Sequence, residues 1–315
     1  MITQKVLLAP NEQVPFDSPF LKYPMLGSIK FDGNRCLLWR DKLLSRTLKE
    51  QPNNNLAKHF AGVLDYAKRH KFVFDGEIWS PKLQFNELQE IIRAFDKPIP
   101  DHVGFYVFDV IGEVEWENGT EGPYEDRDNQ LRKIYCENKF PHVHYVNQIT
   151  LANPEQAESM FNNMIDAGHE GIMVRSMDGK YKHNRASHKQ GIIFKFKNYV
   201  TEDAKIVECV EQVRMTEEYA NSDRPKNEMG HTKRSSKQED YEPADTLGSL
   251  IVEMKDGTRV GISLGRRDAA ERKQMWKDRK KLVGLFVEFS HMEHGSKDVP
   301  RIGKLERFRP DLDNL

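Results

Sequence analysis

The sequence contains few cysteines and no long apolar run. Its three cysteines, Cys36, Cys136 and Cys209, are far apart and show no CxxC or Cys/His spacing, so neither a disulfide framework nor a structural zinc site is indicated. No apolar stretch approaches the ~18 residues that span a membrane. The apolar run before Pro10 is too short for a signal peptide. We therefore expect a soluble, cytoplasmic protein with no membrane partner.

A net charge of one sign is also absent. The 315 residues include 48 Lys and Arg against 49 Asp and Glu, which gives a formal net charge of −1. Positive charge is nevertheless concentrated late in the chain, because residues 180–197 hold six Lys/Arg and no Asp/Glu, and residues 255–309 hold 15 Lys/Arg against 8 Asp/Glu. Local charge decides binding to a polyanion, so the near-zero total does not exclude a nucleic-acid partner.

The length suits two domains of ordinary size, and the patterns of the two parts differ. Up to residue 199, strand-like runs alternate with amphipathic helical runs, which is typical of a mixed α/β domain. The expected strands cover residues 26–31, 35–39, 43–47, 72–79, 104–110, 171–176 and 192–196, and the expected helices cover residues 85–95 and 153–168.

Beyond Tyr199 the pattern changes to strand, loop and strand. Strands are expected at 204–213 and 249–264, the second as a hairpin about Asp256-Gly257, and a helix over 268–282 precedes a strand over 284–293. This composition favours a small barrel of OB type. We place the domains at residues 1–199 and 200–315.

A long polar stretch interrupts the second domain. Residues 215–246 are nearly devoid of aliphatic side chains and cannot bury a core of their own. We predict a long mobile loop there. It is either a solvated insertion or a nucleic-acid contact through Lys233, Arg234 and Lys237.

Two strand-like runs place charged side chains on one face. In FVFDGEIWS, alternation sets Asp75 and Glu77 opposite the aromatic and aliphatic side chains, so the carboxylates are expected to face water or a ligand. In FKFK, Lys195 and Lys197 share a face about 7 Å apart. They repel each other unless an anion such as phosphate lies between them. An exposed basic strand explains the same pattern.

A lysine and a glutamate add two more candidates. Lys30, in GSIKFDGNR, precedes an Asp-Gly pair and is either a surface charge or a nucleophile. Glu170, at the mouth of the strand expected over 171–176, is placed either to hold a divalent metal or to pair with a nearby lysine. The spacing leaves both alternatives open for each residue.

The order of these signals carries a family resemblance. KFDGNR, SRT, DGE, FYVFDV, EGIMVR and FKFK resemble, in this order, motifs I, Ia, III, IIIa, IV and V of the covalent nucleotidyltransferases, specifically the ATP-dependent DNA ligases. The resemblance implies an α+β fold, with an adenylyltransferase domain of antiparallel sheets and flanking helices followed by a β-barrel OB-fold domain. With 29 residues ahead of Lys30, the chain is similar to the minimal two-domain ligases of bacteriophages and some bacteria.

The resemblance also implies a reaction. Lys30 would attack the α-phosphate of ATP and carry AMP, with Mg²⁺ or Mn²⁺ as the metal. AMP would pass to the 5′-phosphate of nicked double-stranded DNA, and the 3′-hydroxyl would then displace it; the protein would act as a monomer. By the same resemblance, Asp32 would orient the 3′-hydroxyl and bind the metal, and Arg35 and Arg46 would hold the nick phosphate or the nucleotide. Glu77 would contact the ribose, Phe108 the adenine and Glu170 the metal. The α-phosphate would be held by Lys195 and Lys197.

Two departures from the family pattern concern the nucleotide. Ser28 stands where many relatives carry a glutamate implicated in adenine recognition. Motif VI, commonly Arg-x-Asp-Lys, appears as ERFRPDLD, in which Leu312 stands in place of the lysine. The resemblance assigns the engagement of pyrophosphate by the OB domain to Arg301, Lys304 and Arg309.

Other interpretations remain. An RNA ligase or an mRNA capping guanylyltransferase would use the same lysyl-nucleotide chemistry, although FDGNR and DGE favour a DNA ligase over the former and the altered motif VI argues against the latter. A non-catalytic nucleic-acid-binding protein would keep the fold, with Lys30 only touching a phosphate.

Overall fold

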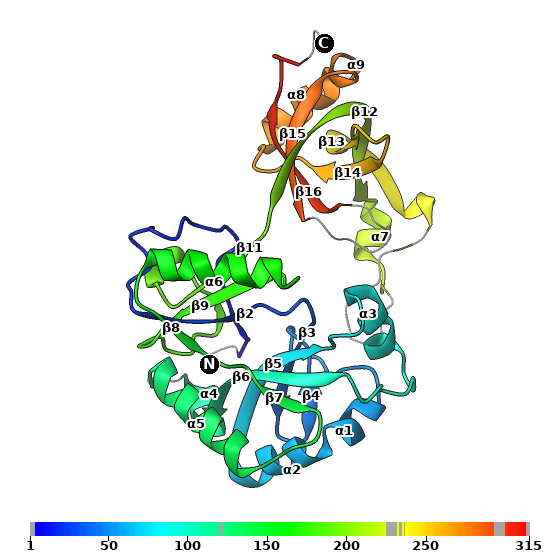
Figure 1. Cartoon of the computed structure of the whole chain (residues 1–315). Helices are drawn as coiled ribbons and strands as arrows, with labels where there is room; N and C mark the ends of the chain where they lie inside the picture. The colour runs from blue at the N-terminus through cyan, green and yellow to red at the C-terminus, as the bar shows by residue number, and fades with distance from the viewer. Residues whose placement is uncertain are drawn as a thin grey trace. The chain divides into compact units, whose positions relative to one another are not determined.

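The chain forms two compact units, Met1–Lys197 and Asn198–Leu315. The computed structural model describes residues 4–119, 122–224, 232, 235, 237–292 and 300–312. Each unit has its own layers of helix and strand (Figure 1). Among the described residues, no helix is long and apolar enough to cross a membrane.

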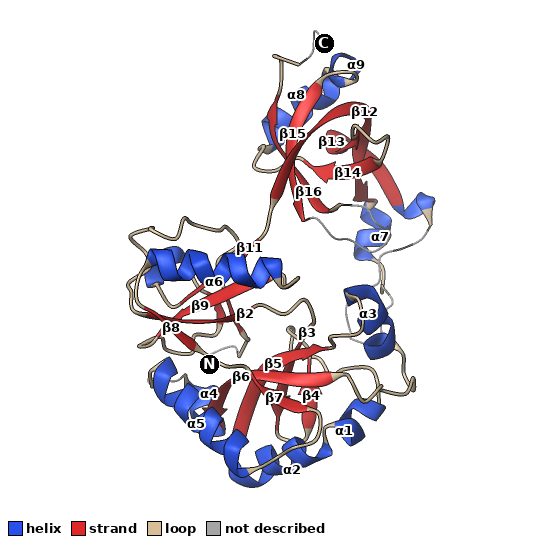
Figure 2. Ribbon diagram, viewed as in Figure 1, coloured by secondary structure: helices blue, strands red, loops and turns tan. Residues whose placement is uncertain are grey.

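The first unit is built on two sheets, shown as red arrows in Figure 2. One has the order β4-β3-β5-β6-β7, and the other has the order β11-β9-β2-β8. Their strands are β2 (Met25–Ile29), β3 (Asn34–Trp39), β4 (Lys42–Leu44), β5 (Phe72–Trp79), β6 (Gly104–Gly112), β7 (Val143–Tyr145), β8 (Ile149–Leu151), β9 (Gly171–Ser176) and β11 (Ile193–Lys197). Two short strands, β1 (Leu7–Leu8) and β10 (Asn184–Arg185), form a separate parallel pair.

Helices cover the outer faces of both sheets. Buried residues of α1 (Asn55–His59), α2 (Ala61–His70), α3 (Phe85–Arg93) and α5 (Tyr124–Glu137) share one core with the five-stranded sheet. Helix α6 (Pro154–Asp166) packs on the four-stranded sheet (Figure 2). Trp116 of the short helix α4 (Glu113–Asn118) joins a core that connects the two sheets.

Alternation along β5 determines which side chains enter the space between the sheets. Phe74 and Ile78 are buried in the core beneath the helices, whereas Val73 belongs to the core that connects the sheets. Asp75, Glu77 and Trp79 therefore lie on the face of β5 that is turned toward the four-stranded sheet.

The second unit is a closed barrel with the order β12-β13-β14-β16-β15. Its strands are β12 (Val200–Met215), β13 (Tyr241–Glu253), β14 (Arg259–Ser263), β15 (Phe286–Met292) and β16 (Arg301–Phe308). Asp256-Gly257 forms the predicted hairpin turn between β13 and β14, with Gly257 at φ +85°. The barrel pairs β14 with β16 in parallel, and β6 and β7 are also parallel. The five-stranded sheet is thus mixed, not purely antiparallel as predicted for the first domain, whereas the four-stranded sheet is antiparallel at each of its pairings.

Two predicted segments of the barrel unit need correction. The helix expected over 268–282 is two helices, α8 (Ala269–Lys277) and α9 (Arg279–Leu282), separated at Asp278, whose carboxylate accepts a hydrogen bond from Lys281. The predicted loop over 215–246 is shorter than expected, because it contains helix α7 (Glu217–Asn221) and β13 already begins at Tyr241. Lys233 and Arg234 lie outside the described residues.

Candidate active site

Lys30 directly follows β2, and its side chain contacts a buried carboxylate. The Lys30 amide donates a hydrogen bond to the carbonyl of Gly171 at 2.9 Å. Its Nζ contacts Oε2 of Glu170, and the Nζ of Lys197 contacts Oε1 of the same carboxylate. The Glu170 side chain is only 3% exposed. Glu170 thus pairs with two lysines at once, and its metal role stays a prediction.

Gly171 makes this contact possible. It has φ +145°, and a Cβ at this position would overlap the carbonyl oxygen of Phe196. The absent side chain lets β9 and β11 approach closely, with Gly171 opposite Lys197 in the register. Glu170 is consequently held beside the end of β11.

The FKFK run alternates as predicted. Phe194 and Phe196 are buried in the core under α6, and Lys195 and Lys197 are half-buried on the opposite face. The pKa of Lys195 is lowered to about 8, first by burial and then by the positive charges of Lys197, Arg185 and Lys30, while Glu170 opposes the shift. This lysine therefore sits in a strongly positive environment.

Two residues near the lysines have no counterpart in the sequence-based predictions. The register places Met173 between Ser28 and Lys195 across three neighbouring strands, so all three side chains lie on one face. Arg185 lies close enough to lower the pKa of Lys195, and it donates a hydrogen bond to the carbonyl of Ala9 at 2.5 Å.

Arg35 belongs to a closed ring of hydrogen bonds. Its Nε and Nη2 each lie 2.6 Å from an oxygen of Asp75, and Nη2 also donates to the carbonyl of Leu7 at 3.2 Å. The Tyr181 hydroxyl donates to Asp75 at 2.5 Å and accepts from the Leu7 amide at 3.1 Å. The prediction that Asp75 faces water or a ligand was wrong, because these partners allow the carboxylate to be fully buried.

Phe108 is an extra residue in β6. The pairing of β5 with β6 shifts register between Asp75 and Gly76, which leaves Phe108 without a partner across the strands. Its ring lies 4.7 Å from the Arg35 guanidinium carbon and 5.0 Å from that of Arg175. Asp109, the next residue, is fully buried and pairs with Arg175 at 2.9 Å.

Glu77 is the other carboxylate on this face of β5. It lies opposite Arg35 in the register and is half-buried. Burial is the main reason that its pKa rises to about 7; Arg35 and Lys30 counteract the shift, and Glu170 and Asp75 add to it. Glu77 is therefore an acid whose charge changes near neutral pH.

The remaining predicted residues fall into two groups. In the first unit, Asp32 is half-buried in the loop after Lys30, and Arg46 is exposed in the turn after β4. In the barrel unit, Arg301 and Lys304 belong to β16, and Arg309 follows it. Arg309 pairs with Asp203 at 2.7 Å and with Asp311 at 2.8 Å.

The sequence predicts two carboxylate ligands for a metal, Asp32 and Glu170. In the described part of the chain, no cluster of three or more His, Cys, Asp or Glu side chains has metal-binding geometry. Mg²⁺ commonly uses one or two carboxylates and takes its remaining ligands from water and substrate phosphates. As carboxylates, the two residues have the ligand chemistry for a metal that binds together with a nucleotide.

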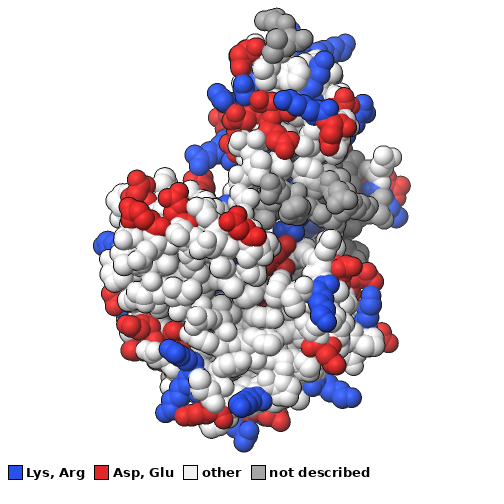
Figure 3. Space-filling model, in the orientation of Figure 1, with Lys and Arg blue, Asp and Glu red and all other residues white. Residues whose placement is uncertain are grey.

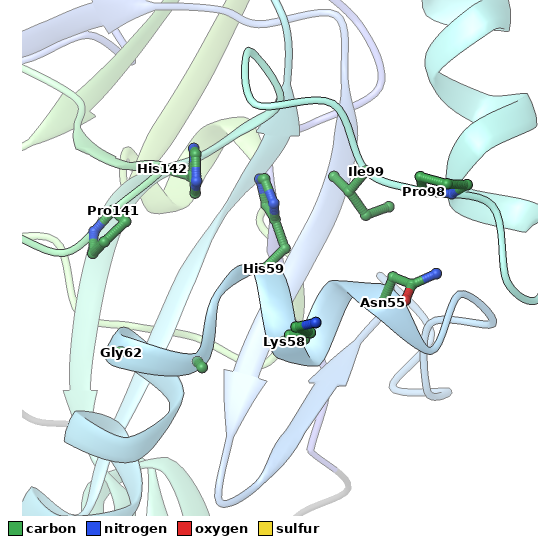
Figure 4. Close-up of a pocket in the computed structure, with 9 residues that line it drawn as sticks. Asn55, Lys58, His59, Gly62, Pro98, Ile99, Pro141 and His142 are labelled. Atoms are coloured by element: carbon green, nitrogen blue, oxygen red, sulfur yellow. The ribbon is translucent and has the colours of Figure 1, made fainter.

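A pocket of about 520 Å³ in the same unit contains none of the predicted site residues. Figure 4 shows His59 at the end of α1 facing His142, with their rings stacked 4.1 Å apart. His59 Nε2 contacts the carbonyl of Val103 and His142 Nδ1 that of Asp101. On the face shown in Figure 3, the charged side chains of the first unit lie mainly toward its edges.

The fold and the residues around Lys30 define a class of protein. The chain has a mixed α/β nucleotidyltransferase fold like that of DNA ligase domains. Residues 20–197, more than half of the chain, match the family described as the ATP dependent DNA ligase domain. The chain belongs to this family, as the sequence motifs predicted.

Comparisons with individual proteins agree with this assignment. The chain is 29% identical over 203 residues to a DNA ligase of Acidianus ambivalens, covering 59% of this chain and 32% of that protein. It is 28% identical over 169 residues to a DNA ligase of Methanopyrus kandleri, covering 49% and 29%. A solved Lig E DNA ligase structure, described as binding DNA with a minimal scaffold, superposes with a TM-score of 0.67 at 19% identity, covering 98% of this chain and all of that one. The matches span about a third of the curated relatives' length.

Proposed function

We propose that this protein is an ATP-dependent DNA ligase that seals nicks in duplex DNA through a lysyl-AMP intermediate. The observation that carries the proposal is the contact of Lys30 with the buried Glu170 carboxylate, beside Lys197 and Lys195. A lysine is a nucleophile only when neutral. Glu170 Oε2 is in contact with Lys30 Nζ and is the atom placed to take its proton.

In the first step, Lys30 Nζ attacks the α-phosphorus of ATP. A phosphorus–nitrogen bond forms, the bond to the pyrophosphate oxygen breaks, and the proton leaves the nitrogen. Lys195 and Lys197 hold the oxygens of the α-phosphate and balance the charge that develops on them. Arg301, Lys304 and Arg309 of the barrel unit engage the pyrophosphate.

The nucleotide is held by the face of β5 and its neighbours. Phe108 offers an aromatic surface to the adenine, and Met173 offers an apolar one from the four-stranded sheet. Glu77 accepts hydrogen bonds from the ribose hydroxyls. Asp32 and Glu170 would hold Mg²⁺, which would neutralise phosphate charge when bound.

The second and third steps use the same centre. An oxygen of the DNA 5′-phosphate attacks the AMP phosphorus, and the phosphorus–nitrogen bond breaks as the nitrogen takes back a proton from Glu170 and leaves as neutral Lys30. The 3′-hydroxyl then attacks the DNA phosphorus, gives its proton to solvent and expels AMP. Arg46 holds the nick phosphate with its planar donors, and Arg35, whose Nε and Nη2 are bound to Asp75, contributes through Nη1. Asp32 orients the 3′-hydroxyl.

The barrel unit acts as an OB-type DNA-binding domain. Its Lys and Arg side chains contact phosphates, so binding is sensitive to salt and independent of sequence. The substrate is nicked double-stranded DNA, and the protein works as a monomer.

The test is intact mass after incubation with ATP and Mg²⁺, first alone and then with nicked DNA. Wild type should gain one AMP and lose it when nicked DNA is added, Lys30→Ala should gain none, and Lys58→Ala, an exposed lysine of α1, should behave as wild type. An adduct formed only with GTP, or sealing confined to RNA strands, would replace this proposal with a capping enzyme or an RNA ligase. The absence of any adduct would leave only a binding protein.

A further inference from the structure

Four rings form a continuous aromatic strip that begins beside Lys30. The strip consists of Phe31, Trp79, Tyr106 and His144. Phe31 lies 5.0 Å from Trp79 and 4.7 Å from Tyr106, centroid to centroid, and Trp79 lies 5.2 Å from Tyr106. The His144 ring stacks on Tyr106 at 4.6 Å. The strip therefore crosses β5, β6 and β7 from the catalytic lysine toward the edge of the sheet.

The strip is continuous with the candidate active site. Phe31 follows Lys30 in the chain, and Trp79 lies on the same face of β5 as Glu77. His169, which precedes Glu170, lies 6.4 Å from the Trp79 ring. The inner end of the strip thus packs on both chain segments that carry the lysine–glutamate contact.

The rings are accessible, and the backbone leaves room for them. Phe31, Trp79 and Tyr106 are only partly buried, and His144 is exposed. Gly104 lies opposite Trp79 in the register, and a Cβ there would come within 2.6 Å of His144 and 3.0 Å of Tyr106. Any side chain at position 104 would displace the outer end of the strip.

Charge separates the strip from the phosphate-binding side of the site. The cations near Lys30 come from elsewhere, with Lys195 and Lys197 on β11 and Arg185 on β10. The strip contains no Lys or Arg, so it is poorly suited to hold phosphate. Aromatic rings are well suited to pack on the apolar faces of sugars and bases.

We propose that the aromatic strip receives the terminal nucleotides of the strand that ends in the 3′-hydroxyl and selects deoxyribose there. This inference rests on the proposed ligase function. At a nick, the cations hold the 5′-phosphate, and the opposing terminus must reach the same phosphorus from another side. A deoxyribose C2′ methylene has no hydrogen bonds to lose when it packs on a ring. A ribose 2′-hydroxyl in the same place would lose its hydrogen bonds to water.

The experiment separates adenylation from sealing. Trp79→Leu and the milder Phe31→Leu are compared with wild type in two assays: formation of the AMP adduct, and single-turnover sealing of nicks that already carry AMP on the 5′-phosphate. The nicks end in either a 3′-deoxyribonucleotide or a 3′-ribonucleotide. Trp39→Leu is the matched control, because Trp39 is a half-buried tryptophan of the same unit that contacts Trp116 outside the strip.

For Trp79→Leu, we expect the rate of adduct formation to stay within about twofold of wild type. The same variant should seal the all-DNA nick about tenfold more slowly. The ratio of deoxyribose to ribose sealing should fall toward one in both strip variants. Equal behaviour of the Trp79 and Trp39 variants would overturn the proposal, and so would an equal loss of adduct formation and sealing, which would place the strip in the nucleotide site. A wild type that forms no adduct would instead overturn the ligase function itself.

Discussion

Lys30 and Glu170 are in direct contact, and the contact joins two segments 140 residues apart in the chain. The second oxygen of Glu170 contacts Lys197, so one carboxylate balances two ammonium groups in a half-buried site. A charge pair of this kind contributes little net stability when intact but is costly to break, since the remaining charges lose their partner. Because Lys30 is the proposed nucleophile, we infer that the pair serves the chemistry.

Glu170→Gln should slow AMP-adduct formation strongly while lowering stability only moderately. The amide keeps the volume of the side chain but cannot take a proton from Lys30 or balance Lys197, so we expect AMP-adduct formation to fall at least about 100-fold. The free energy of unfolding should fall by about 1–3 kcal/mol. Quenched-flow measurement of the adduct and urea denaturation check the two expectations. Glu90→Gln, which removes an exposed pair with Lys97, is the control, and an equal adduct rate for both variants would contradict the role of Glu170.

Tyr181→Phe should loosen Arg35 without removing it. The change deletes the hydroxyl that donates to Asp75 and accepts from the Leu7 amide, at a cost of about 1–3 kcal/mol in stability. Because Arg35 shares Asp75 with this hydroxyl, we expect single-turnover sealing to slow about tenfold. Tyr135→Phe, at a partly exposed tyrosine, should leave both quantities unchanged. Identical sealing by the two variants would show that Tyr181 does not position Arg35.

The strands that carry the site were predictable from the sequence because their patterns are local. FKFK and FVFDGEIW alternate within a single strand, and the hairpin at Asp256-Gly257 is fixed by two adjacent residues. Helix α5 was not predicted, although it has 14 residues. It buries Arg127 and Asp128. Because these polar side chains occupy core positions, the helix lacks the regular spacing of apolar residues that would have predicted it. Arg127 is satisfied by Asp109 of β6, a contact that only the tertiary fold creates.

The same reason explains the misplaced and missed site residues. Asp75 was expected to face water or a ligand, because its partner Tyr181 is 106 residues away in the chain. Arg185 and Tyr181 both lie in the basic stretch 180–197, where the charge was visible but the direction of each side chain was not. Met173 lies within EGIMVR, and only the register of β9 with its neighbours shows that it shares a face with Lys195.

The titration of Lys195 should make the KM for ATP depend on pH near pH 8. Its pKa is lowered to about 8, mainly by burial, so above that pH the folded protein loses the charge that we propose holds phosphate. We expect the KM for ATP to rise as the pH increases above about 8, whereas Lys195→Arg should remove this rise because arginine stays protonated. Between about pH 8 and 10.5 the unfolded chain binds a proton at this residue that the folded chain lacks, so this residue makes stability increase with pH over that range. A KM profile that is identical in wild type and variant would contradict the assignment of Lys195 to the phosphate.

Gly171→Ala should damage the site through the backbone. The new Cβ would overlap the Phe196 carbonyl at φ +145°, and β9 would have to separate from β11. We expect a loss of more than about 3 kcal/mol in urea denaturation and little or no AMP adduct, because Glu170 would move away from Lys197.

Gly168→Ala separates steric overlap from backbone strain, since Gly168 has φ +80° with nothing within 4 Å of an added Cβ. That variant should lose only about 1 kcal/mol and keep its adduct. Equal losses for the two alanine variants would mean that backbone conformation, and not the close approach of the two strands, is what position 171 requires.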